Sequence, residues 1–273
     1  MKKTPIILKF WGNDEMFHEQ ERFSVALTDM ISATKAGGIG TLGEKTLHNV
    51  LKHYYEPNAL WHEVKVGKYV ADIMGKEGII EIQTRNFSAM RKKLEYLLQY
   101  SKVTVVFPVP HLKWVQWIDL DTGEITKKHK SPKIGTTANI FSELVRIKPL
   151  LLHENLSFRV CLMDMEETRC LNGWSQNKKR GSSRCDRIPL NLFEEVILTK
   201  REDYKILMPQ GLSSSFTSQD FRKLSRLPLK AAQNAVNVLA YVGVIKRDGK
   251  LGRLFLYKLT DSIHYDKSEN REE

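Results

Sequence analysis

The sequence predicts an α/β (α+β) protein, and three observations lead to this. Apolar residues recur at helical spacing over residues 15–36 and again over residues 41–55. Residues 60–84 then form three short runs rich in β-branched residues, separated by glycine-containing turns, which is typical of an antiparallel meander. A helix that begins after Asn86 and the continuous apolar run at 103–109, suited to a buried strand, complete the N-terminal pattern.

The rest of the chain predicts a second, smaller domain. A hairpin is expected over 113–130 and a short helix around 140–152, followed by a strand over 157–165 and a polar, basic linker or loop. We therefore expect four parts. These are a first domain at 1–150, an uncertain connecting region at 151–204, a second domain at 205–260 and an acidic, disordered tail at 261–273.

The basic charge is concentrated toward the C-terminus. The chain has 273 residues, 41% of them hydrophobic, and no apolar run reaches the ~18 residues that a membrane span needs. Residues 174–258 hold 17 Lys and Arg against 7 Asp and Glu, which predicts a polyanionic partner, nucleic acid first, with a solvated basic face as the alternative. Three cysteines without Cys-x-x-Cys spacing predict neither a zinc ribbon nor a disulfide framework. We expect a cytoplasmic protein without membrane contact.

Three carboxylates are expected to converge on the meander. Pairing through the turn at 75–78 places Asp72 roughly opposite Glu81, and Gln83 shares the strand face of Glu81. Glu44 lies on the apolar face of the preceding helix, where a carboxylate is costly unless a partner meets it. A hard divalent cation, Mg²⁺ or Mn²⁺, is the economical explanation.

This order of elements resembles the core of the PD-(D/E)xK, or restriction-endonuclease-like, nucleases over about residues 40–110. The resemblance implies a mixed central sheet, with Asp72 and Glu81 as the metal-binding pair of the catalytic site and Glu44 as an additional catalytic carboxylate. Gln83 stands where the family usually has Lys, and would position the attacking water without supplying a charge. Three nearby cations are candidates to supply it: Arg85, Lys92 and Lys93.

These assignments have structural alternatives. The stretch from Thr41 to Glu44 is also a capping box, in which the Glu44 side chain returns a hydrogen bond to the start of the helix. The alternative for Asp72 and Glu81 is that they are ordinary residues on the solvent face of a half-exposed sheet.

Residues 216–259 predict two helices followed by a β-hairpin, and this order resembles the winged helix-turn-helix family. The outward stripe of the second helix carries amide side chains suited to base edges, and the hairpin, or wing, carries cations suited to phosphates. The candidate DNA-binding residues are Lys230, Gln233, Asn234 and Asn237, with Tyr241 on the same stripe, and Lys246, Arg247, Lys250 and Arg253 on the wing. The alternative is a winged helix used only for protein contacts.

Together these features predict a metal-dependent DNA endonuclease that cleaves phosphodiesters in double-stranded DNA. It would act in a transposition, repair or restriction complex, as a homodimer or with other protein subunits. The rival hypothesis is a non-catalytic DNA-binding regulator or assembly protein that uses a degenerate nuclease fold as a scaffold. A third is a structural protein whose basic domain binds acidic partners.

Overall fold

The structure is a computed structural model that describes residues 13–37, 46–171 and 183–260. It begins with helices α1 (Asn13–Gly37) and α2 (Thr46–Tyr55), where the helical spacing predicted them. A buried face of α2, formed by Leu47, Val50 and Leu51, holds this helix against the sheet. Glu44 and the predicted tail at 261–273 lie outside the described residues.

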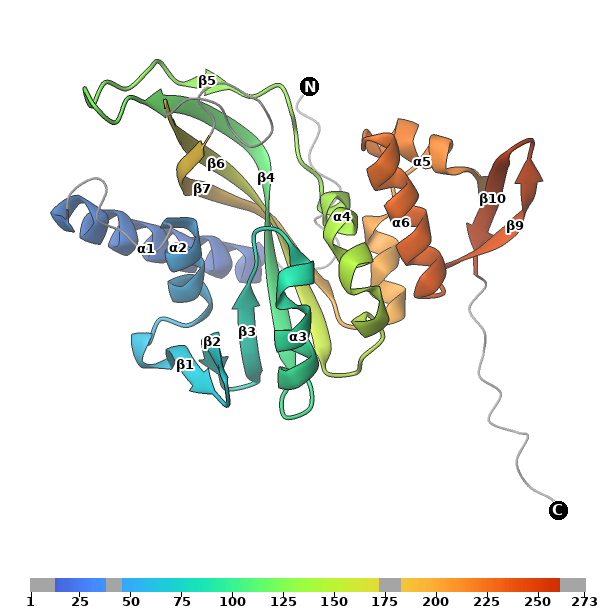
Figure 1. The fold of residues 1–273 in the computed structure, drawn as a ribbon, viewed down its shortest axis with the longest axis horizontal. Helices are drawn as coiled ribbons and strands as arrows, with labels where there is room; N and C mark the ends of the chain where they lie inside the picture. The colour runs from blue at the N-terminus through green and yellow to red at the C-terminus, as the bar shows by residue number, and fades with distance from the viewer. Residues whose placement is uncertain (1–12, 38–45, 172–182, 261–273) are drawn as a thin grey trace.

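The main sheet has seven strands in the order β1-β2-β3-β4-β6-β7, with β5 paired to β4 off this path (Figure 1). The antiparallel meander that the sequence predicted is formed by β1, β2 and β3. The sheet is mixed, because β4 runs parallel to both β3 and β6 whereas β7 is antiparallel to β6. The strands are β1 (His62–Val66), β2 (Tyr69–Gly75), β3 (Gly78–Ile82), β4 (Val103–Ile118), β5 (His129–Lys130), β6 (Leu156–Cys170) and β7 (Ser183–Leu198).

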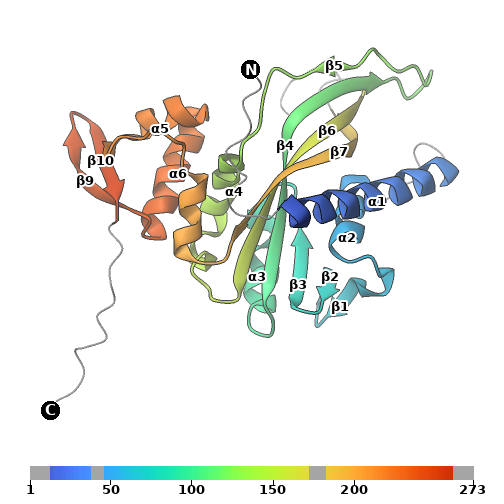
Figure 2. The same ribbon diagram turned by 180° about the vertical axis from the view of Figure 1, so that it is seen from behind.

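Helices cover both faces of this sheet. Helices α1 and α2 lie on the face turned toward the viewer in Figure 2, and α3 lies on the face turned toward the viewer in Figure 1. Neighbouring residues of β4 point to opposite faces of the sheet. Val106 packs in the hydrophobic cluster with α1 and α2, and Val105 packs in the cluster with α3. The remaining helical elements before β6 are the 3-10 turn η1 (Ala59–Trp61), α3 (Phe87–Leu97), η2 (Thr137–Ile140), α4 (Phe141–Leu144) and η3 (Val145–Leu150).

The sheet does not end near residue 150, where we expected the first domain to stop. The connecting region predicted at 151–204 contains β6 and β7, which continue the sheet beyond β4. The charged start of β7 suggested a linker, because the sequence does not reveal that its cations pair with a carboxylate on β6. The predicted hairpin at 113–130 is present, with Trp114 opposite Lys130.

The C-terminal part contains two helices and a small sheet. After η4 (Arg201–Leu207) come β8 (Ser215–Phe216), α5 (Ser218–Ser225), α6 (Leu229–Tyr241), β9 (Ile245–Leu251) and β10 (Leu254–Leu259). The three strands form a sheet in the order β8-β10-β9. Thr217 and Asp220 form a capping box at the start of α5.

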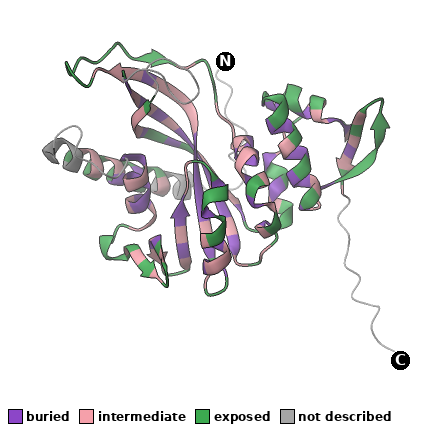
Figure 3. Ribbon diagram, in the orientation of Figure 1, coloured by how far each residue is buried: buried purple, intermediate pink, exposed green. Residues whose placement is uncertain are grey.

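One hydrophobic core joins this part to the main sheet. Buried Phe141 and Leu144 of α4 belong to the same cluster as Phe221 of α5 and Val236 of α6, and the ring centroids of Phe141 and Phe221 are 6.2 Å apart. Figure 3 shows buried residues continuing from the sheet through α4 into α6. The C-terminal part is therefore packed on the sheet instead of being tethered by a linker.

Two further features concern the cysteines and the membrane. Cys170 on β6 and Cys185 on β7 form a disulfide with their Cα atoms 5.8 Å apart, which the cysteine spacing did not predict, and Cys161 is free and buried. Among the described residues, no helix combines the length and apolar character that crossing a bilayer requires.

Candidate functional site

Asp72 and Glu81 lie side by side where β2 and β3 separate. The antiparallel register ends at the pair of Ile73 and Ile80, and Asp72 and Glu81 are the next residues along each strand. The Asp72 carboxylate accepts a hydrogen bond of 2.7 Å from the backbone N–H of Ile82, the residue that follows Glu81. The proximity of these two carboxylates follows from the turn at Gly78, where the Cβ of any other residue would collide with the Lys102 carbonyl oxygen.

The two carboxyl groups have opposite pKa shifts. Burial, followed by the negative charge of Asp72, raises the pKa of Glu81 to about 7 although Lys93 opposes the change. Burial also acts against ionisation of Asp72, but hydrogen bonds from His48 and from the Ile82 backbone outweigh it and hold the pKa of Asp72 below its usual value. Near neutral pH the pair therefore carries one firmly ionised carboxylate and one that readily gains or loses a proton.

Lys93 provides a positive charge at this site. Its Nζ lies 2.5 Å from Glu81 Oε2, and the two side chains are 19% and 5% exposed. The other Glu81 oxygen, Oε1, is buried and has no hydrogen-bond partner among the described residues. A buried carboxylate oxygen without a donor is costly, so a ligand able to contact it would stabilise the site.

The remaining predicted residues of this site lie around the pair. The backbone N–H of Gln83 donates to the carbonyl oxygen of Val106 on β4, which extends the pairing of β3 with β4 by one residue. Its side-chain amide donates to the carbonyl oxygen of Asn86 at 3.3 Å. Arg85 and Lys92 are exposed, so Lys93 is the one of the three candidate cations that contacts a predicted carboxylate. Glu44 is outside the described residues, and no position for it can be compared with the prediction.

His48 belongs to this site and was not predicted from the sequence. Its Nε2 lies 3.2 Å from Asp72 Oδ2, and it is carried by α2. Its position one helical turn after Glu44, on the same face, was a signal available in the sequence. Across the described residues, no group of three or more His, Cys, Asp and Glu side chains has a geometry suited to a metal ion. The ligands available to a cation here are therefore the two carboxylates, with the Glu81 Oε1 atom free of hydrogen bonds.

The predicted DNA-binding stripe on α6 is largely exposed. Lys230, Gln233, Asn237 and Tyr241 are exposed, and Asn234 is half-buried. The Nζ atom of Lys148, from η3, donates to Asn237 Oδ1 at 3.2 Å and lies 5.1 Å from the Tyr241 ring centroid, which adds a cation to the stripe that the sequence did not indicate.

The β9–β10 hairpin carries the four predicted wing cations on its exposed surface: Lys246, Arg247, Lys250 and Arg253. Two of them stack on Phe255, since the Arg247 guanidinium lies 4.1 Å and the Lys250 ammonium 5.2 Å from its ring centroid. The hairpin thus combines positive charge with an exposed aromatic ring.

Comparisons with known proteins give a family but no activity. A family model described as "Domain of unknown function (DUF8091)" matches residues 45–199, more than half of the chain. An uncharacterized protein from Treponema pallidum (strain Nichols) is 34% identical over 129 residues, which cover 47% of this chain and 51% of the relative. The chain thus spans about half the length of that relative. No solved structure matches. The matched region contains Asp72, Glu81 and Lys93 and runs to the end of β7, and the chain belongs to the DUF8091 family.

Proposed function

We propose that the protein is a metal-dependent DNA endonuclease of the PD-(D/E)xK type. The observation that carries the proposal is the adjacent pair of Asp72 on β2 and Glu81 on β3, with the ammonium group of Lys93 on Glu81. The helix–meander–helix–strand order and the mixed sheet are further support, because the sequence resemblance implied both.

The residues present suit a hard divalent cation such as Mg²⁺ or Mn²⁺. Asp72 and Glu81 supply two carboxylates, and Glu81 Oε1 is a buried acceptor without a donor. A bound cation would stabilise negative charge on a phosphodiester and favour deprotonation of water. Lys93 would hold Glu81 in place and offset negative charge near the reacting phosphate. Gln83 cannot offset that charge because its side chain is neutral.

The C-terminal part would bind duplex DNA as a winged helix. This is supported by the exposed polar stripe of α6, by the three-stranded sheet order β8-β10-β9 and by the exposed cations of the β9–β10 hairpin. Such a protein would act in the cytoplasm on double-stranded DNA, with partner subunits or as a homodimer.

Two measurements on full-length protein test the proposal. Nicking of supercoiled plasmid in Mn²⁺ should be seen with the parent and lost in Glu81→Ala and Lys93→Ala, with binding to the same DNA retained. Mg²⁺ should also raise the melting temperature of the parent but not of Asp72→Asn, because a ligand that binds only the folded state stabilises it. Parent activity equal to that of Glu81→Ala, together with equal metal effects on parent and Asp72→Asn, would refute the catalytic proposal.

A second candidate is a DNA-binding protein without catalysis. The specific observation in its favour is that the Gln83 amide is already bonded to the Asn86 carbonyl oxygen, while Lys93 forms an ion pair with Glu81 as a purely structural lysine would. Gln83→Lys separates the candidates. An active site should tolerate or gain from the added cation, whereas a degenerate scaffold should remain inactive while still binding DNA.

A further inference from the structure

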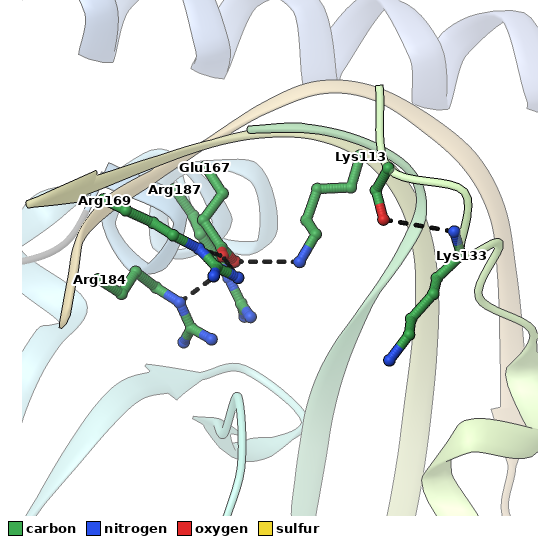
Figure 4. Close-up of polar contacts among 7 residues, drawn as sticks. Lys113, Lys133, Glu167, Arg169, Arg184 and Arg187 are labelled. Atoms are coloured by element: carbon green, nitrogen blue, oxygen red, sulfur yellow. Dashed lines mark hydrogen bonds and ion pairs between the residues drawn. The ribbon is translucent and has the colours of Figure 1, made fainter. Parts of the chain in front are cut away.

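A carboxylate on β6 is surrounded by four cations from three strands. Glu167 is 1% exposed and contacts Lys113 of β4, Arg169 of β6, and Arg184 and Arg187 of β7 (Figure 4). The shortest distances from its oxygens are 3.4 Å to Lys113 Nζ, 2.7 Å to Arg169 Nη2, 3.2 Å to Arg184 Nε and 3.1 Å to Arg187 Nε. These five residues are called the Glu167 cluster below.

Positive charge is in excess in the Glu167 cluster. One carboxylate faces four cations, and each guanidinium has five N–H donors, so most donors are left over once Glu167 is bonded. Burial and the neighbouring Arg187 lower the pKa of Arg184, and burial lowers the pKa of Lys113 although Glu167 opposes it. The buried Arg184 Nε forms its ion pair with Glu167 without hydrogen-bond geometry. These cations repel one another, and a single Glu167 does not compensate for them.

The Glu167 cluster is near the candidate carboxylate site. Arg85, which follows the end of β3, is close enough for its charge to contribute to the lowered pKa of Arg184, after burial and the closer cations. The start of α2, which carries His48, is held by hydrogen bonds from Thr46 to Asp186 of β7. In Figure 4 the ends of Arg184 and of the exposed Lys133 point toward the same side of the view. More than one cation is therefore available to a ligand approaching from that side.

We propose that the Glu167 cluster binds a phosphate group of a nucleic-acid strand. A phosphate carries the negative charge that the cluster lacks, and planar guanidinium groups match its oxygens in bidentate geometry. The inference rests on the proposed function in one respect, that the ligand is DNA, and it adds a strand contact within the family-matched part of the chain, separate from α6 and the wing. The phosphate belongs either to the backbone or to a strand end, and both sources share this chemistry.

The test is duplex binding by full-length protein in EDTA, so that cleavage plays no part. Fluorescence anisotropy with a short labelled blunt duplex, with and without 5′-phosphates, is measured over a series of KCl concentrations. We compare the parent with Arg184→Ala, whose side chain is 27% exposed and lies at the edge of the cluster. The matched control is Arg91→Ala, because Arg91 is an ion-paired arginine on α3, over the opposite face of the sheet.

Arg184→Ala should weaken binding severalfold and lower the slope of log K against log [KCl] by about one, whereas Arg91→Ala should leave both unchanged. The melting temperature of Arg184→Ala without DNA should be equal to or above that of the parent, because one repelled cation has been removed. A purely structural arginine would show the reverse, with a lower melting temperature and unchanged binding. That pattern would overturn the inference.

The same experiment distinguishes a backbone phosphate from a phosphate at a strand end. It also distinguishes failure of this inference from failure of the catalytic proposal. A gain in parent affinity on 5′-phosphorylation that Arg184→Ala lacks assigns the site to a strand end, and equal affinity for both duplexes assigns it to the backbone. If the plasmid and melting assays both refute the catalytic proposal but Arg184→Ala still weakens binding, the inference stands and the catalytic proposal fails. Equal affinity and slope for Arg184→Ala and Arg91→Ala overturn the inference and leave the catalytic proposal intact. A parent that binds no duplex overturns the inference.

Discussion

Replacing Glu81 with Gln should stabilise the metal-free protein at neutral and higher pH. The pKa of Glu81 is about 7 in the folded protein against an ordinary value of 4.5, a rise caused first by burial and then by the charge of Asp72. Between these pH values the unfolded chain has released this proton and the folded chain still holds it, so the free energy of unfolding falls as pH rises. The difference corresponds to roughly 3 kcal/mol above pH 7. Glu81 is 5% exposed, so solvent screens this effect little.

The assay is urea denaturation of the parent and Glu81→Gln in EDTA at several pH values between 5 and 8. The glutamine keeps an acceptor for Lys93 but does not ionise, so the two proteins should have similar stability at pH 5, and the parent should become less stable by up to about 3 kcal/mol at pH 8. The lowered pKa of Asp72 acts in the opposite sense and at more acidic pH, where protonation removes stability. The control is Glu95→Gln, an exposed carboxylate on the same helix as Lys93. Parallel pH dependence in the parent and Glu81→Gln would refute the reasoning.

Three further predictions concern other parts of the chain. Arg159→Leu should lower the free energy of unfolding by about 3 kcal/mol in urea, because Glu195 is 4% exposed and would lose its cation; a loss below about 1 kcal/mol would contradict this. Cys185→Ser removes a cross-link between residues 15 apart and should cost about 3 kcal/mol under oxidising conditions, whereas reduction of the parent should cost the same and have no effect on the variant. Phe255→Ala should weaken duplex binding without changing the salt slope, because it frees the two cations stacked on the ring but removes no charge; a changed slope in anisotropy titrations would argue against this.

Local patterns predicted most of the fold before the end of β4. The helices at α1, α2 and α3 and the meander of β1 to β3 are set by short-range periodicity and by turns such as that at Gly78, which the sequence displays directly. The strand β7 could not be predicted in the same way. Its first residues are charged because Arg184 and Arg187 pair with Glu167 on β6, and a partner on another strand leaves no local signal.

The same distinction applies to the candidate site. The adjacency of Asp72 and Glu81 could be predicted, because hairpin register follows from the position of the turn. The choice of Lys93 over Arg85 and Lys92 could not, because it depends on how α3 is rotated against β3. The contact of His48 with Asp72 depends likewise on the packing of α2.

The core shared by the sheet, α4 and α6 fixes how far apart the two candidate DNA contacts are. Parts of a protein that swing on a linker can engage sites at variable separation, but the buried contact of Phe141 with Phe221 and the cluster around it oppose such motion. The distance between the wing and the Asp72–Glu81 edge should therefore stay constant. A ligand that contacts both the wing and the Asp72–Glu81 edge must span one constant distance, and the position of any cut relative to the bound sequence would be invariant.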